Sequence, residues 1–163
     1  MILLLDADAL IKLNRAGILG LVAEVFECII PDEVYQEVVI KGKQSGHTDA
    51  EEIERIIESG IEVKPPAPVR EVESRLDRGE SAVLALASQQ GSQVIISDDR
   101  QFVNFLSRSG IPHPVPAALI VVMVQQHLMT KSEAREALEQ LRPSVREISY
   151  REALQELERL EES

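Results

Sequence analysis

The chain has 163 residues, 44% of them hydrophobic, which suits one domain with a packed core. Its formal net charge of -11 disfavours non-specific adhesion to nucleic acid or to anionic membranes, and so argues against a protein that merely coats DNA. No basic signal-peptide region precedes the apolar start, and the longest apolar run, 117–124, is too short to span a bilayer, so we expect a cytoplasmic protein with no membrane segment.

The first part of the chain alternates short apolar runs with helical patterns. Ile2–Leu5 is a continuous apolar run, which is typical of a strand buried on both faces. A helical pattern follows over 9–25 and is broken around Gly17 and Gly20. The elements expected next are a strand over 27–30, a helix over 32–40, a polar loop over 41–47, a helix over 49–58 that stops at Gly60, and a strand over 61–63.

Prolines and helical stripes organise the rest of the chain. Pro65, Pro66 and Pro68 predict a stiff surface connector. The elements expected after it are a helical stripe at Val69, Val72 and Leu76, a helix over 80–87 that ends near Gly91, a strand over 93–96, a helix over 102–106, and a short last strand among the prolines at 112, 114 and 116.

The C-terminal part reads as helical. Residues 117–128 are strongly apolar and are expected in the core or in a dimer contact. Two later helices carry capping-box signatures at their starts, which are Thr130 with Glu133 and Ser149 with Glu152.

Apolar runs that alternate with amphipathic helices predict a three-layer α/β/α fold with a central parallel sheet of four or five strands. No internal repeat is visible in the sequence. We therefore expect a single domain over 1–163, with a core over about 1–142 and a C-terminal helical extension over about 149–161.

Acidic residues follow two of the predicted strands. In an open parallel sheet the ligand crevice lies beyond the carboxyl ends of the strands. Asp6 and Asp8 come directly after the first strand, and Ser97 is followed by Asp98 and Asp99 after the fourth. Two strand ends thus deliver carboxylates to the same edge of the sheet.

Two glutamates join this set from helices. Glu37 lies in the helix after the second strand, and Glu80 begins a helix and shares its apolar stripe with Val83. Each acid also has an ordinary explanation, as a helix cap, a partner of the helix dipole or a solvated residue. The chain has 28 acids, so single coincidences are common, and only the ordered set indicates a site.

Four stretches, in this order, resemble the motif blocks of the PIN-domain family. They are LLLDADALIKL at 3–13, IIPDEVYQEV at 29–38, DRGESAVLALA at 77–87 and VIISDDRQF at 94–102. The third stretch is most similar to the branch of predicted nucleic-acid-binding PIN proteins related to the toxin ribonucleases of toxin–antitoxin pairs. The chain departs from that branch at HPVPAAL, 113–119, where a Gly-Thr-containing turn is common.

The resemblance implies roles for particular residues. Asp6, Glu37, Glu80 and Asp99 correspond to the catalytic, metal-binding acids of the family, and Asp98 is the alternative to Asp99. Ser97 corresponds to the family's small hydroxyl residue near the site, and Asp8 has a secondary place. The implied partners are an RNA substrate, with an antitoxin protein and a homodimer left open.

The chemistry of such a site is that of a divalent cation. Carboxylates in one cleft repel one another, and Mg²⁺ or Mn²⁺ removes the conflict because both prefer oxygen ligands. A metal-activated water would then hydrolyse a phosphodiester, with Glu37 or Glu80 left open as the group that positions the water. Lys41, Lys43 and Arg100 are candidates for substrate contact, or are ordinary surface charge.

Two other functions fit part of the pattern. The fold could serve as a catalytically silent module that binds nucleic acid or protein, which the negative net charge favours. The LLLDADAL stretch also resembles the opening of haloacid-dehalogenase-type phosphatases, where Asp6 would be the nucleophile. That interpretation leaves Glu37 and Glu80 unused, and no convincing Ser/Thr block with a basic Lys block lies between the acidic motifs.

Overall fold

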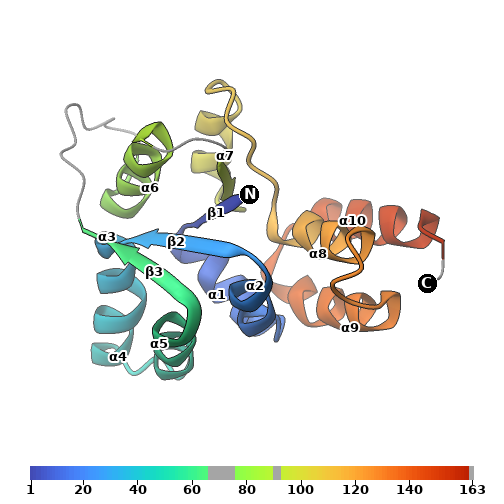
Figure 1. Ribbon diagram of the computed structural model, residues 1–163, viewed down its shortest axis with the longest axis horizontal. Helices are drawn as coiled ribbons and strands as arrows, with labels where there is room; N and C mark the ends of the chain where they lie inside the picture. Colours follow the sequence, from blue (N-terminus) through green and yellow to red (C-terminus); the bar gives the residue numbers. More distant parts are fainter. Residues whose placement is uncertain (66–75, 90–92, 162–163) are drawn as a thin grey trace.

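A computed structural model describes residues 1–65, 76–89 and 93–161. Its centre is a parallel sheet with the strand order β3-β2-β1-β4 (Figure 1). The strands are β1 (Ile2–Leu5), β2 (Glu27–Pro31), β3 (Ile61–Lys64) and β4 (Gln93–Ile96). The predicted three-layer α/β/α fold is confirmed, with four strands in the described part of the chain.

Helices cover both faces of the sheet (Figure 1). One face carries α6 (Arg78–Gln89) and α7 (Arg100–Leu106), and the other carries α1 (Ala7–Arg15), α2 (Leu19–Val25) and α5 (Asp49–Gly60). Residues 3–5 of β1 are 0% exposed. Because side chains alternate across a strand, an uninterrupted apolar strand needs a cover on both faces, and this sheet provides it.

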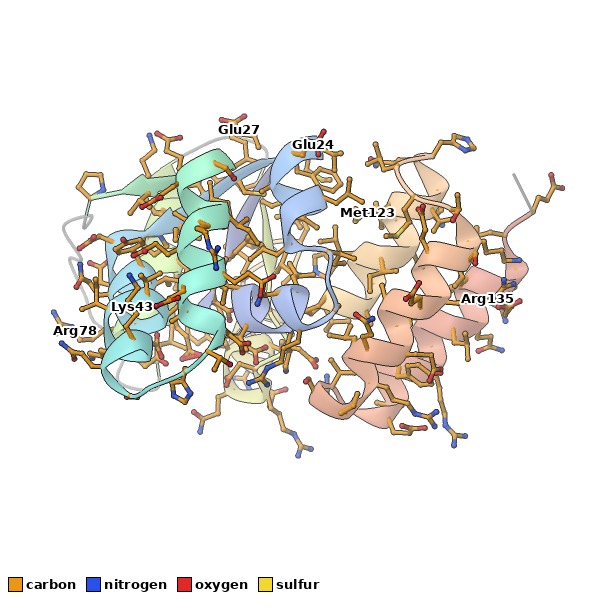
Figure 2. The ribbon with its side chains drawn as sticks, turned by 90° about the horizontal axis from the view of Figure 1, so that it is seen from below. Glu24, Glu27, Lys43, Arg78, Met123 and Arg135 are labelled. Carbon is orange, nitrogen blue, oxygen red and sulfur yellow. The ribbon has the colours of Figure 1, made fainter. Side chains whose placement is uncertain are left out.

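A group of helices from the last third of the chain packs beside the sheet (Figure 1). Its members are α8 (Pro116–Gln125), α9 (Lys131–Leu141), the 3₁₀ turn η2 (Arg142–Ser144) and α10 (Glu147–Arg159). α10 packs against α8 and α9, and both of these contact α1. Met123 of α8 is fully buried between this group and the sheet-containing part (Figure 2), so the apolar segment at 117–128 supplies core residues.

Two local predictions were wrong. The polar loop expected over 41–47 is helical at its start, because α3 (Asp32–Tyr35) continues through a π-helical turn, η1 (Gln36–Ile40), into α4 (Lys41–Gln44). The last strand expected among the prolines at 112–116 is not a strand. There the Ile95 N–H donates to the Pro112 carbonyl at 3.0 Å, without a ladder, since proline cannot donate to one.

The two capping boxes had different outcomes. At the start of α9 the Glu133 N–H donates to Thr130 Oγ1 and the Thr130 N–H donates to Glu133 Oε2, as predicted. Ser149 instead lies inside α10, which begins after Arg146, and it is only 6% exposed. Packing of α10 on its neighbours, rather than a local cap, sets where this helix begins.

Some predictions lie outside the described residues. These concern the stripe at Val69 and Val72, the connector at Pro66 and Pro68, and the helix end near Gly91. Of the helices that the structure does describe, none is long and apolar enough to cross a bilayer.

The strand order creates a topological switch point between β1 and β4. From β1 the chain proceeds to β2 and β3 on one side, and it crosses to the other side of β1 for β4. Open parallel sheets bind ligands beyond the carboxyl ends of their strands at such a point. Asp6 directly follows β1 and Ser97 directly follows β4, so the predicted acids stand where the topology places a ligand.

Candidate acidic active site

Asp6 joins the end of β1 to the start of α1. Its Oδ1 accepts a hydrogen bond from the Ala9 N–H at 2.7 Å, which makes Asp6 the N-cap of α1. The residue is only 3% exposed, and burial raises the pKa of its carboxyl to about 7. Hydrogen bonds from Ser97 and Ala9 lower that pKa, and the charges of Asp8 and Glu80 raise it. The buried carboxyl carries a desolvation cost that a bound cation would offset.

Glu80 and Asp77 cap the start of α6 reciprocally. The Glu80 N–H donates to Asp77 Oδ1 at 2.8 Å, and the Asp77 N–H donates to Glu80 Oε1 at 3.1 Å. Glu80 is 8% exposed, and burial raises the pKa of its carboxyl to about 7, with further upward contributions from the charges of Asp77 and Asp99. Its carboxyl and that of Asp99 both line one cavity, where like charges oppose ionisation of both groups.

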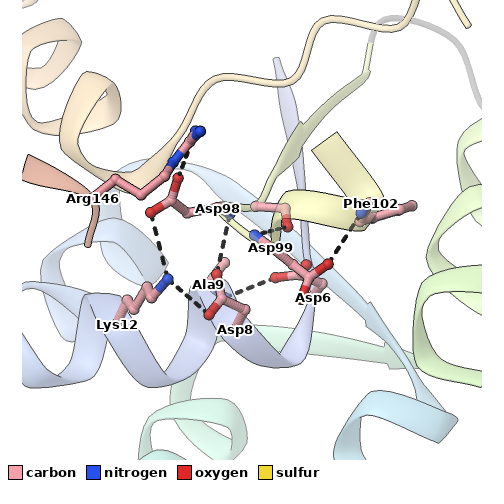
Figure 3. Close-up of polar contacts among 9 residues, drawn as sticks. Asp6, Asp8, Ala9, Lys12, Asp98, Asp99, Phe102 and Arg146 are labelled. Atoms are coloured by element: carbon pink, nitrogen blue, oxygen red, sulfur yellow. Dashed lines mark hydrogen bonds and ion pairs between the residues drawn. The ribbon is translucent and has the colours of Figure 1, made fainter. Parts of the chain in front are cut away.

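Ser97 connects the two strand ends. Asp99 is the N-cap of α7, with its Oδ1 accepting from the Phe102 N–H at 3.0 Å, and its own N–H donates to Ser97 Oγ at 3.2 Å (Figure 3). Ser97 is fully buried, and its hydroxyl hydrogen-bonds the Asp6 carboxyl. Ser97 therefore ties Asp6, after β1, to Asp99, after β4.

Glu37 reaches the same place from the π-helical turn η1. Such turns are rare and occur frequently at functional sites. Glu37 is exposed as a whole residue, but partial desolvation of its carboxyl raises its pKa, the charge of Asp77 raises it further, and Lys41 lowers it. The close approach depends on Gly79, because a Cβ at that position would lie 3.1 Å from Glu37 Oε2. A glycine before Glu80 thus makes room for Glu37.

A cavity of about 100 Å³, hereafter the acid cavity, brings these side chains together. Its lining includes Ala7, Gly79 and six acidic residues, which are Asp6, Asp8, Glu37, Asp77, Glu80 and Asp99. The four acids that the sequence predicted as catalytic all contribute to this lining. They come from four separate segments, which only the fold brings together.

Asp98 points elsewhere. Its side chain is 1% exposed, and its two carboxylate oxygens lie 3.5 Å from the Lys12 ammonium and 3.5 Å from the Arg146 guanidinium (Figure 3). The contact with Arg146 is an ion pair by distance, without hydrogen-bond geometry, and leaves Oδ1 with no hydrogen-bond donor among the described residues. Asp98 therefore lies outside the lining of the acid cavity, where Asp99 takes the predicted place.

Asp8 is held by the same set of contacts. Lys12 Nζ lies 2.9 Å from Asp8 Oδ1, and the Asp98 N–H donates to Asp8 Oδ2 at 3.1 Å (Figure 3). Both carboxylate oxygens of Asp8 are therefore engaged. This fits the secondary place that the sequence suggested, with Asp8 orienting the loop after β4.

The three predicted substrate cations are placed differently. Lys41 lines two larger cavities that also include Glu37, and it makes no ion pair with a described residue. Lys43 instead donates to both carboxylate oxygens of Glu54 at 2.7 Å, and it is absent from the lining of the acid cavity. Arg100 is exposed at the first position of α7, next to Asp99.

The donor set matches a hard divalent cation in its chemistry. Asp6 and Asp99 each use one carboxylate oxygen as a helix cap, and carboxylate oxygens are ligands that suit Mg²⁺ and Mn²⁺. Within the described ranges, no three Asp, Glu, His or Cys side chains stand in an arrangement that could already hold an ion. Like charges with no cation between them separate or take up protons, and the raised pKa values of Asp6 and Glu80 are consistent with the second response.

Sequence reasoning missed three residues. Asp77 lines the acid cavity and caps α6, and the Asp-x-x-Glu spacing with Glu80 is a capping signal that could have revealed it. Lys12 could have been predicted from the sequence, because its i,i+4 spacing from Asp8 is typical of an ion pair on a helix. Arg146 comes from the turn before α10 and gave no local signal, because only the fold brings it to Asp98.

The parallel sheet with acids at its switch point defines an α/β domain with an acidic candidate site. A family model described as PIN domain matches residues 2–162, and the chain belongs to the PIN-domain family. PIN domains are generally nucleases that bind nucleic acids, and they typically use divalent metal ions. A search of curated proteins and a search of solved structures gave no match.

Proposed function

We propose that this protein is an endoribonuclease that depends on Mg²⁺ or Mn²⁺ and hydrolyses phosphodiesters in the acid cavity. The observation that carries the proposal is the meeting of six acidic residues in one cavity at the switch point of the sheet. Six carboxylates in about 100 Å³ would repel one another strongly, and a divalent cation is the simplest partner that offsets this cost.

Asp6, Glu80 and Asp99 are the residues that would hold the ion. Asp6 and Glu80 are buried, and both contact Asp99 or its hydrogen-bond partner Ser97. When bound, a divalent ion polarises the phosphoryl oxygen and lowers the pKa of a bound water. The caps at Asp6 and Asp99 keep these carboxylates fixed relative to the two helix starts, which aids catalysis by orientation.

Glu37 is the proposed group that orients the attacking water and accepts its proton. The two carboxyl groups of Asp6 and Glu80 are already hydrogen-bonded, whereas no described residue hydrogen-bonds the Glu37 carboxylate. Glu37 lines the acid cavity from η1, an element separate from α6 and α7. This arrangement favours Glu37 over Glu80 as the group that positions the water, a role for which the sequence left both residues open.

Lys41 and Arg100 are the proposed contacts to the phosphate backbone. Lys41 lies beside Glu37 with its ammonium free of described partners, and Arg100 follows the capping residue Asp99. With a net charge of -11, the protein cannot rely on a broad basic surface, so the few cations near the acid cavity matter more.

RNA as the substrate, an antitoxin protein as a partner, and a homodimer all rest on the family resemblance. The third motif stretch, with Gly79 and Glu80 opening an alanine-rich helix, is most similar to the branch related to toxin ribonucleases. As part of the proposal, the protein acts as the toxin of a toxin–antitoxin pair. Growth arrest on expression, lost in Asp6→Asn, would support this role.

The test is cleavage of a panel of single-stranded RNA, structured RNA and DNA in Mg²⁺ or Mn²⁺, with an EDTA control. We expect RNA cleavage by the wild type and a loss of at least about a hundredfold in Asp6→Asn and in Glu80→Gln. The matched control is Glu24→Gln, because Glu24 is exposed on α2 near the amino end of β2, away from the acid cavity (Figure 2). Equal cleavage by Asp6→Asn and wild type would refute the proposed site.

A catalytically silent binding module is the second candidate. Two observations favour it: the net charge of -11, and the fact that no group of acids, histidines or cysteines in the described residues is already arranged around an ion position. A folded wild type that binds RNA in Mn²⁺ but cleaves no member of the panel would make this the better description.

A further inference from the structure

A second cavity, hereafter the side cavity, opens next to the acid cavity. Its volume is about 250 Å³, and it shares Ala7 and Glu37 with the acid cavity. It lies among α1, η1, α4 and α5, which are grouped on the same side of the sheet (Figure 1). A water molecule takes about 30 Å³ of liquid volume, so the side cavity has room for a ring system rather than for a single ion.

The walls of the side cavity are apolar and its rim is polar. Ala7 and Ile11, which are partly buried, form the apolar part that a ligand can touch, whereas Ala50 and Ile53 also line it but are 1% and 0% exposed. At the rim, Ser45 and His47 are exposed, and Arg15 pairs with Asp49 at 3.3 Å. Apolar walls accept the faces of a flat ring, while polar rim groups can meet its edge.

We propose that the side cavity takes one unpaired base of the nucleic acid strand, next to the phosphate that lies in the acid cavity. This inference rests on the proposed function and adds the substrate class to it. Lys41 lines the side cavity and lies beside Glu37, so its free ammonium meets the phosphate between the two positions. A base in a duplex is stacked and paired, so the subsite selects single-stranded segments, loops or ends.

The charge of the protein supports a base pocket independently. A net charge of -11 opposes binding that relies on phosphate contacts and counterion release. Contacts between a base and apolar walls neutralise no phosphate and release no counterion, so they add nothing to that salt dependence. A strand that binds this protein must therefore draw affinity from its bases and from the ion-filled acid cavity, rather than from a basic surface.

The test compares two short single strands of equal length and equal phosphate charge, one with bases and one built of abasic nucleotides. Binding is measured by fluorescence anisotropy in Mg²⁺ with Glu37→Gln, which removes the proposed proton acceptor so that cleavage does not interfere and leaves in place the three residues that would hold the ion. We expect the strand with bases to bind about tenfold more tightly or better, the size expected for a base held against side chains. The ratio should be the same at about 50 and about 200 mM salt, because both strands carry the same phosphates.

Filling the side cavity provides the matched pair of variants. Ile11 is partly buried at the side cavity, so Ile11→Trp in the Glu37→Gln background should abolish the preference for bases. Ile148 is 61% exposed on α10, and Ile148→Trp should leave the preference intact. His47→Ala, at an exposed rim position that tolerates truncation, should reduce the preference several-fold even if Ile11→Trp folds poorly.

Ribose and deoxyribose versions of the two strands, and a duplex of the same sequence, complete the comparison. The duplex should bind no better than the abasic strand. Equal binding of the strand with bases and the abasic strand, or a preference that survives both Ile11→Trp and His47→Ala, overturns the proposal, as does the absence of binding by either strand. Wild-type cleavage without base preference would refute the subsite alone, and base-dependent binding without wild-type cleavage would refute the nuclease alone.

Discussion

Glu80 stands in the first turn of α6 and Asp99 caps α7, yet the two side chains lie close enough for the charge of Asp99 to raise the pKa of Glu80. Like charges that approach one another in a cavity favour the uptake of a proton or the binding of a cation. The pair therefore joins the two helix starts at a point where a proton or a divalent cation would offset the repulsion. This relationship links the stability of the fold, the pH and the binding of metal.

Without metal, the protein should lose stability as the pH rises from about 4 to about 7. Burial raises the pKa of Asp6 and of Glu80 to about 7, so the folded state holds two protons that the unfolded chain has already released. The free energy of unfolding should fall by on the order of a few kcal/mol across this window and level off above it. Thermal melts in EDTA at several pH values measure this, and Asp6→Asn should flatten the curve because an amide does not ionise. A wild-type Tm that rises through this window would contradict the burial argument.

Metal should stabilise the protein above pH 7 through Asp99 and not through Asp98. An ion at about 100 times its Kd raises the free energy of unfolding by about 2.7 kcal/mol. Asp99→Asn should remove most of the Mn²⁺-dependent rise in Tm, since Asp99 lines the acid cavity. Asp98→Asn should keep the rise but start from a fold less stable by on the order of 1–3 kcal/mol, because Lys12 and Arg146 lose a buried partner. The reverse result would place the ion at Asp98.

The adjacent residues Asp98 and Asp99 show where sequence reasoning reaches its limit. The strand at 93–96 could be predicted from its apolar run, and with it the edge of the sheet at which both acids emerge. Which of them enters the acid cavity depends on Arg146 and Lys12, which attract Asp98 to the other side. Arg146 is far away in sequence, so no local pattern could resolve the choice.

Segments whose structure follows from their own residues were predictable, and those set by packing were not. The apolar strands and the capping box at Thr130 depend on local sequence, and both predictions were correct. The helix expected to start at Ser149 begins earlier, because contacts of α10 with α8 and α9 outweigh one side-chain cap. The π-helical turn that carries Glu37 likewise has no sequence signature, so its effect on the acid cavity is known only from the structure.

Gly79→Ala should reduce cleavage without reducing stability. The new Cβ would stand 3.1 Å from Glu37 Oε2, the mobile end of a long side chain, so the carboxylate would shift rather than the backbone. Alanine is favoured over glycine in a helix by up to about 1 kcal/mol, so Tm should stay level or rise. Cleavage should fall by about ten- to a hundredfold, as expected for a misplaced catalytic group.

The control for this prediction is Gly20→Ala in α2. A Cβ at Gly20 would meet nothing within 4 Å, so this variant should gain the same helix preference and keep full activity. If Gly79→Ala cleaves RNA as fast as Gly20→Ala, the approach of Glu37 to Gly79 has no part in the chemistry.

Lys41→Ala should weaken substrate binding, whereas Lys43→Ala should not. Both lysines were candidates from the sequence, but Lys43 is bonded to Glu54 and Lys41 has no ion-pair partner in the described residues. Loss of a charged hydrogen bond to phosphate costs about 1.5–3 kcal/mol, which should raise KM by about tenfold or more. If the contact is equally strong in ground and transition states, kcat remains unchanged at high pH.

The pH profile separates a phosphate contact from a purely structural role of Lys41. The Lys41 ammonium lowers the pKa of Glu37, so its removal should raise that pKa and move the rising limb of the kcat profile to higher pH. Lys43→Ala should leave the limb in place and change the stability little, because it removes only a solvent-exposed ion pair. A limb that stays fixed in Lys41→Ala would mean that Glu37 is not the group whose ionisation controls cleavage, even if KM rises as expected.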